Sequence, residues 1–142
     1  SAEQLKNILS LSKIKKGDKV ADIGSGDGKI VIEFAKKGAE AHGYEINPFL
    51  VFLSRRNIEK AGLKGKAFIH WKNFWKENLG KYDVITLFQV NYVMRKLGKK
   101  LEKEAKKKIK IVSHYWKFPE WKPKKTKGDV FYYEIKKERE FR

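Results

Sequence analysis

The sequence has no cysteine and no long apolar segment. Without cysteine among its 142 residues, the chain cannot form disulfides, thiolate zinc sites or a cysteine nucleophile. It also has no run of about 18 apolar residues that would predict a membrane-spanning helix. The lack of cysteine fits a reducing compartment, and we therefore expect a cytoplasmic protein without a membrane segment.

Arginine and acidic residues are scarce beside lysine. Lysine supplies 29 of the 34 basic residues, against 17 acidic residues, so the formal net charge is +17. Residues 72–142 hold 21 basic and 9 acidic residues, whereas residues 1–71 hold 13 and 8. One interpretation is a surface for nucleic acid or acidic protein. The other is a lysine-rich thermophile surface, and the scarcity of arginine weighs against a phosphate-reading surface.

Apolar periodicity predicts a single domain, residues 1–142, in which helices and strands alternate. Helical spacing covers residues 3–13, 30–38, 47–62 and 93–107, and short apolar runs predict strands at 19–23, 39–44, 66–70, 82–88, 109–114 and 130–136. Such alternation is typical of an α/β fold with a mostly parallel sheet and ligands at the carboxyl ends of the strands. We expect residues 117–128, rich in proline and lysine, to form a loop.

The stretch "ADIGSGDGKI", residues 21–30, places three glycines between a predicted strand and a predicted helix. Free amide groups and the helix dipole favour polar or anionic ligands at such a turn. The spacing does not match the phosphate P-loop, and Gly28 comes one residue too early for the dinucleotide fingerprint. A tight turn without any ligand is the remaining alternative.

Two acids narrow the choice of ligand. Asp27 lies within the glycine loop, where its charge would repel a pyrophosphate but suit a cationic group such as an amine or a sulfonium. Glu45 ends the second predicted strand, and its two oxygens can accept both hydroxyls of a ribose. Together the two acids predict a site for a nucleoside that carries a cationic end.

The motif Asp22-x-Gly24-x-Gly26-x-Gly28, followed by Glu45, resembles the seven-strand, Rossmann-like methyltransferases that use S-adenosylmethionine. Further segments resemble the small archaeal protein-lysine methyltransferases more specifically, namely DIGSGDGKIVI (22–32), GYEINP (43–48), SR (54–55), NFWK (73–76) and FPEW (118–121). The relatives of those enzymes include mitochondrial enzymes that methylate lysines of ATP synthase and of adenine nucleotide translocase.

The resemblance implies a three-layer Rossmann-like methyltransferase fold with S-adenosylmethionine as cofactor and S-adenosylhomocysteine as product. We expect a mostly parallel sheet of about six strands with a final antiparallel strand, because residues 115–128 leave no room for a further helix of the family. Relatives also have a proline-containing segment that would lie just before Ser1, so we expect part of a lid to be missing.

The resemblance also implies an activity, protein-lysine N-methylation with a broad range of substrates. The expected partners are lysine-containing proteins, chromatin or other basic proteins among them, and the expected state is a monomer. Because the chain has 29 lysines of its own, self-methylation is a further hypothesis. The alternatives are an RNA or small-molecule methyltransferase and a non-catalytic nucleic-acid-binding module.

Cofactor contacts are carried over from the resemblance by position. It implies that the methionine moiety lies among residues of the glycine loop, namely Asp22, Gly24, Ser25, Gly26, Asp27 and Gly28. It assigns the ribose to Glu45, one side of the adenine to Ile46, and the other side to Asn73 and Phe74. Relatives usually carry aspartate at position 73, but an asparagine can still bond the adenine edge.

The fourth predicted strand ends at residues 88–92, where this architecture usually faces the methyl group. Gln89, Asn91 and Tyr92 carry oxygens that can orient an amine, and a helix cap or a strand-end hydrogen bond is their alternative role. Enzymes that methylate amino groups of bases tend to carry two prolines at this point. Their absence here weighs against base N-methylation.

Residues 115–121 and the histidines form the last group of candidates. The aromatic rings of residues 115–121 can hold a lysine stem or ammonium, or they can simply cover the edge of the sheet. His114 could act as a base, but a strand-end histidine with a satisfied hydrogen bond is commoner. No histidine and carboxylate cluster has ligand spacing, so we expect no metal site.

Overall fold

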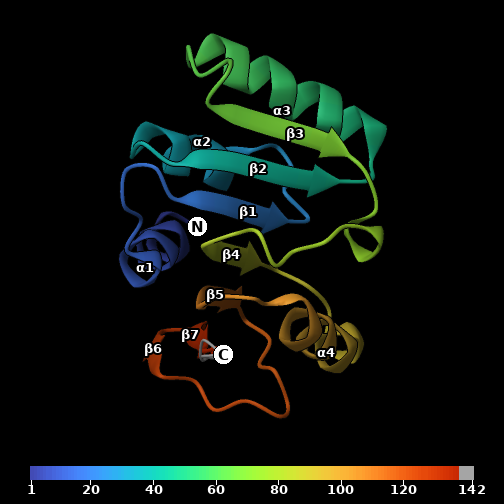
Figure 1. The fold of residues 1–142 in the computed structure, drawn as a ribbon. Coiled ribbons are helices and arrows are strands. Elements are labelled where there is room, and N and C mark those ends of the chain that lie inside the picture. The colour runs from blue at the N-terminus through green and yellow to red at the C-terminus, as the bar shows by residue number, and fades with distance from the viewer. Residues whose placement is uncertain (138–142) are drawn as a thin grey trace, which may run out of the picture.

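The computed structural model describes residues 1–137, which form a seven-stranded sheet in the order β3-β2-β1-β4-β5-β7-β6. Figure 1 shows the strands side by side with the helices packed around them. The elements in chain order are α1 (Ala2–Ser12), β1 (Lys19–Ile23), α2 (Lys29–Lys36), β2 (Glu40–Glu45), α3 (Pro48–Lys60), β3 (Ala67–Trp71), η1 (Phe74–Lys76), β4 (Val84–Leu87), η2 (Asn91–Val93), α4 (Met94–Glu104), β5 (Ile109–His114), β6 (Lys125–Lys127) and β7 (Val130–Ile135).

The sheet confirms the expected fold class, with one strand more than expected. Strands β1 to β5 pair in parallel, and β7 pairs antiparallel with β5. The extra strand is β6, which lies inside the segment expected to be a loop and pairs antiparallel with β7. Its three residues are all exposed and its sequence is Lys-Thr-Lys, so no apolar alternation marks it as a strand.

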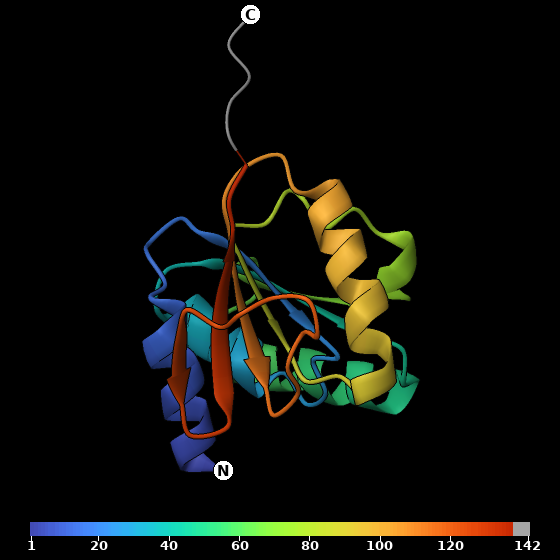
Figure 2. The same cartoon turned by 90° about the horizontal axis from the view of Figure 1, so that it is seen from below.

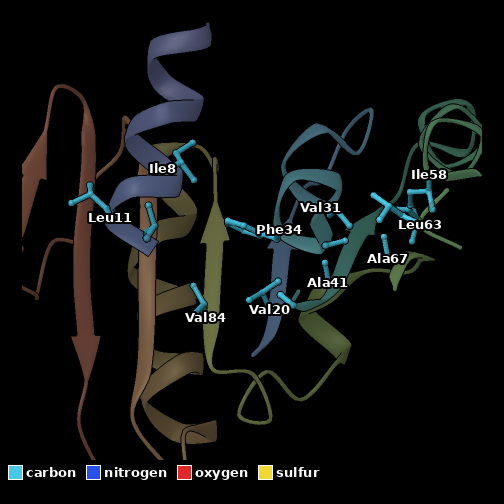
Figure 3. Close-up of a cluster of buried hydrophobic side chains, with 14 of the residues drawn as sticks. Ile8, Leu11, Val20, Val31, Phe34, Ala41, Ile58, Leu63, Ala67 and Val84 are labelled. Atoms are coloured by element: carbon cyan, nitrogen blue, oxygen red, sulfur yellow. The ribbon is translucent and has the colours of Figure 1, made fainter. Parts of the chain in front are cut away.

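Helices cover both faces of the sheet, which confirms the expected three layers. The views in Figures 1 and 2 place α4 across the sheet from α1, α2 and α3. One apolar cluster joins α1, α2 and α3 to the sheet, and Figure 3 shows Ile8, Phe34 and Ile58 of these helices with Val20 and Val84 of the strands. The second cluster packs α4 on the opposite face. Within residues 1–137, no helix combines the length and apolar character needed to cross a membrane.

Helix α3 begins where the sequence predicted. The side chain of Asn47 accepts hydrogen bonds from the backbone N–H groups of Phe49 and Leu50, at 2.9 and 3.3 Å, and Pro48 occupies the first turn. An asparagine cap followed by proline satisfies free amide groups and sets the backbone angle for a helix. This start turns the chain sharply away from the end of β2, where Glu45 lies.

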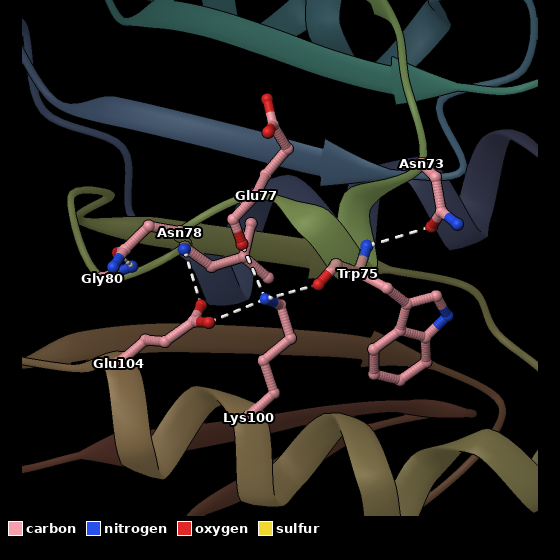
Figure 4. A network of polar contacts seen from close by, with 8 residues as sticks. Asn73, Trp75, Glu77, Asn78, Gly80, Lys100 and Glu104 are labelled. Atoms are coloured by element: carbon pink, nitrogen blue, oxygen red, sulfur yellow. Dashed lines mark hydrogen bonds and ion pairs between the residues drawn. The ribbon is translucent and has the colours of Figure 1, made fainter.

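Lys100 of α4 forms hydrogen bonds with the segment that connects β3 and β4, as Figure 4 shows. Its Nζ donates to the carbonyl oxygens of Trp75 and Glu77, at 3.1 and 2.6 Å, and to Oε2 of Glu104 at 2.7 Å. Because the ammonium is mostly buried, these charge-assisted bonds compensate for its lost hydration. The short helix η1, between β3 and β4, is thereby held beside the carboxyl ends of the strands.

Candidate functional site

The glycine loop joins β1 to α2 through backbone conformations that favour glycine. Gly24, Gly26 and Gly28 have φ angles of 76°, 57° and 86°, in the left-handed region that other residues rarely adopt. At Gly28 a Cβ atom would also lie 3.0 Å from Cβ of Ser54, on α3. The loop is therefore a tight turn closed against α3.

Glu45 connects this loop to the end of β2. Its Oε1 accepts from the backbone N–H of Gly26 at 2.9 Å, and its Oε2 accepts from those of Ile46 and Asn47 at 3.0 and 2.9 Å. A carboxylate has about four acceptor positions, so three are used and one is left. The residue expected to bind ribose thus also has a structural role, which its sequence position did not reveal.

Gly43, on β2, provides the space in which the loop lies. A Cβ at this position would be 2.6 Å from both Cβ and Oγ of Ser25, and 2.8 Å from Cδ1 of Ile69. Ser25 is buried, and within residues 1–137 its Oγ has no hydrogen-bond partner. The close packing of Ser25 on Gly43 holds the glycine loop against β2.

Asp22 is a buried acid at the end of β1. It is 5% exposed, and Thr86, its partner in the neighbouring strand β4, donates from Oγ1 to Oδ1 at 2.8 Å. Burial raises the pKa of Asp22 to about 7, the Thr86 hydrogen bond opposes this rise, and the charges of Glu45 and Asp27 add to it. A cationic ligand group beside Asp22 would favour its ionised form.

A pocket of about 220 Å³ opens at the carboxyl ends of β1, β4 and β5, on the face of the sheet that α1 covers. Four of the predicted cofactor residues line it, namely Asp22, Gly24, Ser25 and Asp27. Its other lining residues are Ile8, Lys29, Ile30, Thr86, Leu87, Phe88, Val112 and His114. Gly26, Gly28 and Glu45 lie outside this lining and belong to the backbone network that shapes the loop.

The residues expected around an adenine lie next to the ends of β2 and β3. Ile46 is 69% exposed, and Nε1 of Trp71 donates to its carbonyl oxygen at 3.0 Å. Asn73 caps η1, since its Oδ1 accepts from the backbone N–H of Trp75 at 3.0 Å. Phe74 is half-buried against the Trp75 ring, with centroids 4.6 Å apart. Capping therefore uses one of the two acceptor positions of the Asn73 oxygen and leaves the other for the adenine edge.

The three residues expected to orient an amine follow β4, but none of them lines the pocket. Gln89 is half-buried and its Nε2 donates weakly to the carbonyl oxygen of Ile23, at 3.4 Å, which is the strand-end role named as its alternative. Asn91 and Tyr92 are exposed on η2, Tyr92 to 85%. From this segment it is Phe88 that reaches the pocket.

The aromatic segment 115–121 divides between two roles. Phe118 and Trp121 pack on one another, with centroids 4.3 Å apart, and both pack on Tyr133 of β7. The backbone N–H of Phe118 also donates to the Tyr133 hydroxyl at 3.1 Å. These two rings cover the sheet, which was the alternative to substrate binding, whereas Tyr115 is 55% exposed.

Eight lining residues were not among the predicted cofactor residues, and Ile8, Lys29 and His114 are three of them. Ile8 comes from α1 and Lys29 from the start of α2, because these helices pack over the ends of the strands. His114 also lines the pocket, yet within residues 1–137 its buried Nε2 makes no hydrogen bond. Of the two alternatives named for His114, a base and a strand-end histidine with a satisfied hydrogen bond, the second does not describe its Nε2. The sequence did offer a signal for this position. His114 follows the buried Val112 by two residues, and residues two apart on a strand point to the same face of the sheet.

Metal ligation has no candidate in the part of the chain that the structure describes. Among residues 1–137, no group of three or more histidine or acidic side chains is arranged to hold an ion.

The fold is that of the Rossmann-like methyltransferases. It matches a crystal structure of an RNA methyltransferase from Salinibacter ruber in complex with S-adenosyl-L-homocysteine, with a TM-score of 0.92 and 28% identity, over 99% of this chain and 95% of that one. A model of the ANTKMT methyltransferase domain matches residues 22–125. The chain therefore belongs to the ANTKMT methyltransferase family.

Two curated relatives illustrate the family. A protein-lysine N-methyltransferase of Saccharolobus islandicus is 37% identical over 124 residues, which are 86% of this chain and 77% of that protein. A human lysine N-methyltransferase named for ATP synthase is 37% identical over 129 residues, or 91% of this chain. These residues make up 55% of the human protein, so this chain spans about half the length of that relative.

Proposed function

We propose that the chain is a protein-lysine N-methyltransferase that uses S-adenosylmethionine. The observation that carries this proposal is the pocket in which the buried Asp22 and the glycine loop meet, at the ends of β1 and β4. Relatives named as lysine methyltransferases support the choice of substrate.

The residues present fit such a cofactor. Asp22 and Asp27 offer carboxylates to a cationic group, and Asp22 has a pKa near 7 that a neighbouring cation would lower. Glu45 keeps one acceptor position for a ribose hydroxyl and can exchange its backbone bonds for a second. Ile46, Asn73 and Phe74 would hold the adenine. We name residues 22–28 with Glu45 the cofactor half of the site.

The methyl acceptor would approach the other half of the site. Residues 88–92 with Tyr115, which we name the substrate half, contain four large exposed side chains, those of Phe88, Val90, Tyr92 and Tyr115. Such surfaces can pack on the methylene stem of a lysine, and the rings can attract its ammonium. Basic proteins, and the chain itself, are the substrates to examine first.

The bound cofactor would supply a methyl group carried on a sulfonium. The protein must therefore present the lysine nitrogen with its lone pair free, although an ordinary lysine has a pKa of about 10.4. A dry pocket next to a positive charge lowers that pKa, because both burial and like charge disfavour the ammonium. Asp22, at the floor of this site, is only 5% exposed.

RNA methylation is the second candidate function. It is favoured by the similarity to the Salinibacter ruber protein, which is named as an RNA methyltransferase, and by the net charge of +17. The lack of both prolines after β4 and the predominance of lysine over arginine weigh against it.

A side-by-side assay tests the proposal. The chain is incubated with methyl-labelled S-adenosylmethionine and with an oligolysine peptide, a lysine-rich protein, an RNA, or no addition. Label in the peptide or protein, located on lysine by mass spectrometry, supports the proposal, and label in the sample without addition supports self-methylation. Transfer to RNA alone would replace lysine with RNA as the substrate, and no transfer at all would reject a methyltransferase.

A further inference from the structure

His114 is the last residue of β5 and part of the pocket wall. Its ring packs on Phe88 of the substrate half, with centroids 4.8 Å apart. Phe88 and His114 lie at the ends of the paired strands β4 and β5, and both line the pocket together with the buried Thr86 and Val112. An acceptor that enters beside Phe88 would meet this imidazole.

Packing alone does not explain why an imidazole lines the pocket at this position. Its Nε2 is buried and has no hydrogen-bond partner within residues 1–137. Leaving such a nitrogen unsatisfied costs about 1–3 kcal/mol. A phenylalanine or leucine would fill the same space without that cost. The polar ring therefore needs a reason beyond packing.

A carboxylate lies behind the ring. Oδ2 of Asp129, in the turn between β6 and β7, lies 3.5 Å from Nε2 of His114. This is longer than a hydrogen bond, but catalytic hydrogen bonds are often long before the substrate binds. A carboxylate at Nε2 favours the tautomer that carries its proton there, which leaves the lone pair on Nδ1.

The backbone holds this pair together under strain. Tyr115, directly after His114, has a φ of 75°, which is unfavourable for a bulky residue with a Cβ. Its N–H donates to the carbonyl oxygen of Asp129 at 2.6 Å, while the strand register sets His114 opposite Val130. Such strain costs about 1–3 kcal/mol and is concentrated at functional sites.

We propose that His114 is the base that takes a proton from the substrate lysine before methyl transfer. This inference rests on the proposed function. One N–H bond of the ammonium breaks, a new N–H bond forms at Nδ1, and the freed electron pair stays on the lysine nitrogen. The imidazolium then releases its proton to water. Asp129 is a positioning residue, since it acts through the ring.

Several charged groups lie around this ring. Asp22, Asp27 and Lys29 line the same pocket, and Asp129 lies on the far side of the ring.

The kinetic test uses His114→Asn, which keeps an acceptor near the Nδ1 position but cannot take up a proton. With oligolysine as acceptor, we expect kcat at pH 7 to fall about 100-fold, at the lower end of the usual range for losing a general base. The deficit should shrink to less than about threefold at pH 9.5, where about a tenth of the lysine is neutral in solution, against less than about a thousandth at pH 7. S-adenosylhomocysteine should bind within twofold of the parent. Asp129→Asn should give a smaller deficit with the same pH trend.

A second measurement does not depend on turnover. The chain has three histidines, so NMR signals of their rings can be assigned from single substitutions. In the presence of S-adenosylhomocysteine, oligolysine should shift the His114 signals but leave those of His42 and His70 in place. Unchanged His114 signals would contradict the proposal.

The matched control is His70→Asn, on β3, outside the pocket lining, for which kcat should stay within twofold at both pH values. A His114→Asn deficit that is the same at pH 7 and 9.5, or none at all, overturns the proposal. So does a loss of S-adenosylhomocysteine affinity as large as the loss of kcat, which would make the ring a cofactor contact. If the parent chain does not methylate oligolysine or any protein, the proposed function fails first, and this inference fails with it.

Discussion

The cofactor half of the site is held by backbone hydrogen bonds, whereas the substrate half presents exposed side chains. In the cofactor half, Glu45 accepts three backbone N–H groups and Asp22 lies buried under a Thr86 hydrogen bond. In the substrate half, Tyr92 is 85% exposed and the one hydrogen bond of the Gln89 side chain within residues 1–137 is 3.4 Å long. The difference indicates that the fold prepares the cofactor half in advance, whereas contacts in the substrate half would form only when the proposed substrate binds.

Adding a methyl group beneath the glycine loop should damage the cofactor half most. Gly43→Ala would place Cβ 2.6 Å from Ser25, and the loop must move to relieve that contact. We expect a loss of about 1–3 kcal/mol in the free energy of unfolding and a weakening of S-adenosylhomocysteine binding by roughly 30-fold or more, about 2 kcal/mol. Urea unfolding and calorimetric titration measure the two effects.

Gly98→Ala is the control for this prediction, because Gly98 lies on α4 and its nearest neighbour, Cδ1 of Phe118, would be 3.3 Å from the new Cβ. Its S-adenosylhomocysteine affinity should equal that of the parent. Equal losses in both variants would mean that the loop is not held by Gly43.

Removing the charge of Glu45 should have the next largest effect. Glu45→Gln replaces one acceptor oxygen by an NH₂ group that faces backbone donors, so at least one of the three N–H bonds is lost. We expect S-adenosylhomocysteine to bind about 10–30-fold more weakly, from about 1.5–2 kcal/mol of lost charged hydrogen bonding. Glu59→Gln, an exposed position on α3, should bind normally. Unchanged binding in Glu45→Gln would remove this residue from the cofactor half.

Asp22→Asn should weaken binding but stabilise the fold at neutral pH. Because the pKa of Asp22 is raised from 3.8 to about 7 on folding, its contribution to stability is complete below pH 3.8 and is lost as the pH rises through 7. Asparagine has no such loss and can still accept from Thr86. We therefore expect a gain of roughly 1–3 kcal/mol in the free energy of unfolding at pH 8, and a smaller gain at pH 5.

The same variant should bind S-adenosylhomocysteine roughly tenfold more weakly at pH 7.5, since the cationic amine loses a carboxylate partner. Unfolding curves of both proteins at pH 5 and 8 provide the stability comparison. A gain that is equal at the two pH values would show that Asp22 is not titrating between them.

Truncating an exposed ring of the substrate half should have the smallest effect on the protein itself. Tyr92→Ala removes a side chain that is 85% exposed, so the free energy of unfolding should change by less than about 0.5 kcal/mol. S-adenosylhomocysteine affinity should stay the same, while KM for oligolysine rises about threefold or more through the loss of a stacking contact. Phe49→Ala on α3, 70% exposed in the parent, is the control and should leave KM unchanged.

Local sequence signals predicted the elements that depend on neighbours in the chain. The glycine loop, the Asn47-Pro48 start of α3 and the strand at 109–114 all appear in the structure as expected. Each is determined within a few residues, by backbone conformation, by a capping hydrogen bond or by an apolar run. The family itself was recognisable from such short motifs, and the match over residues 22–125 confirms it.

Tertiary structure alone decided features that join distant segments. The burial and pKa of Asp22 depend on Thr86, 64 positions away, and the three exposed residues of β6 become a strand only because β7 offers them partners. In the same way, the rings of Phe118 and Trp121 pack on the face of the sheet that α4 covers, whereas His114 lines the pocket and lies beside Asp129. Sequence spacing sets which groups lie near one another along a strand, but desolvation and charge depend on what the whole sheet and its helices bring around them.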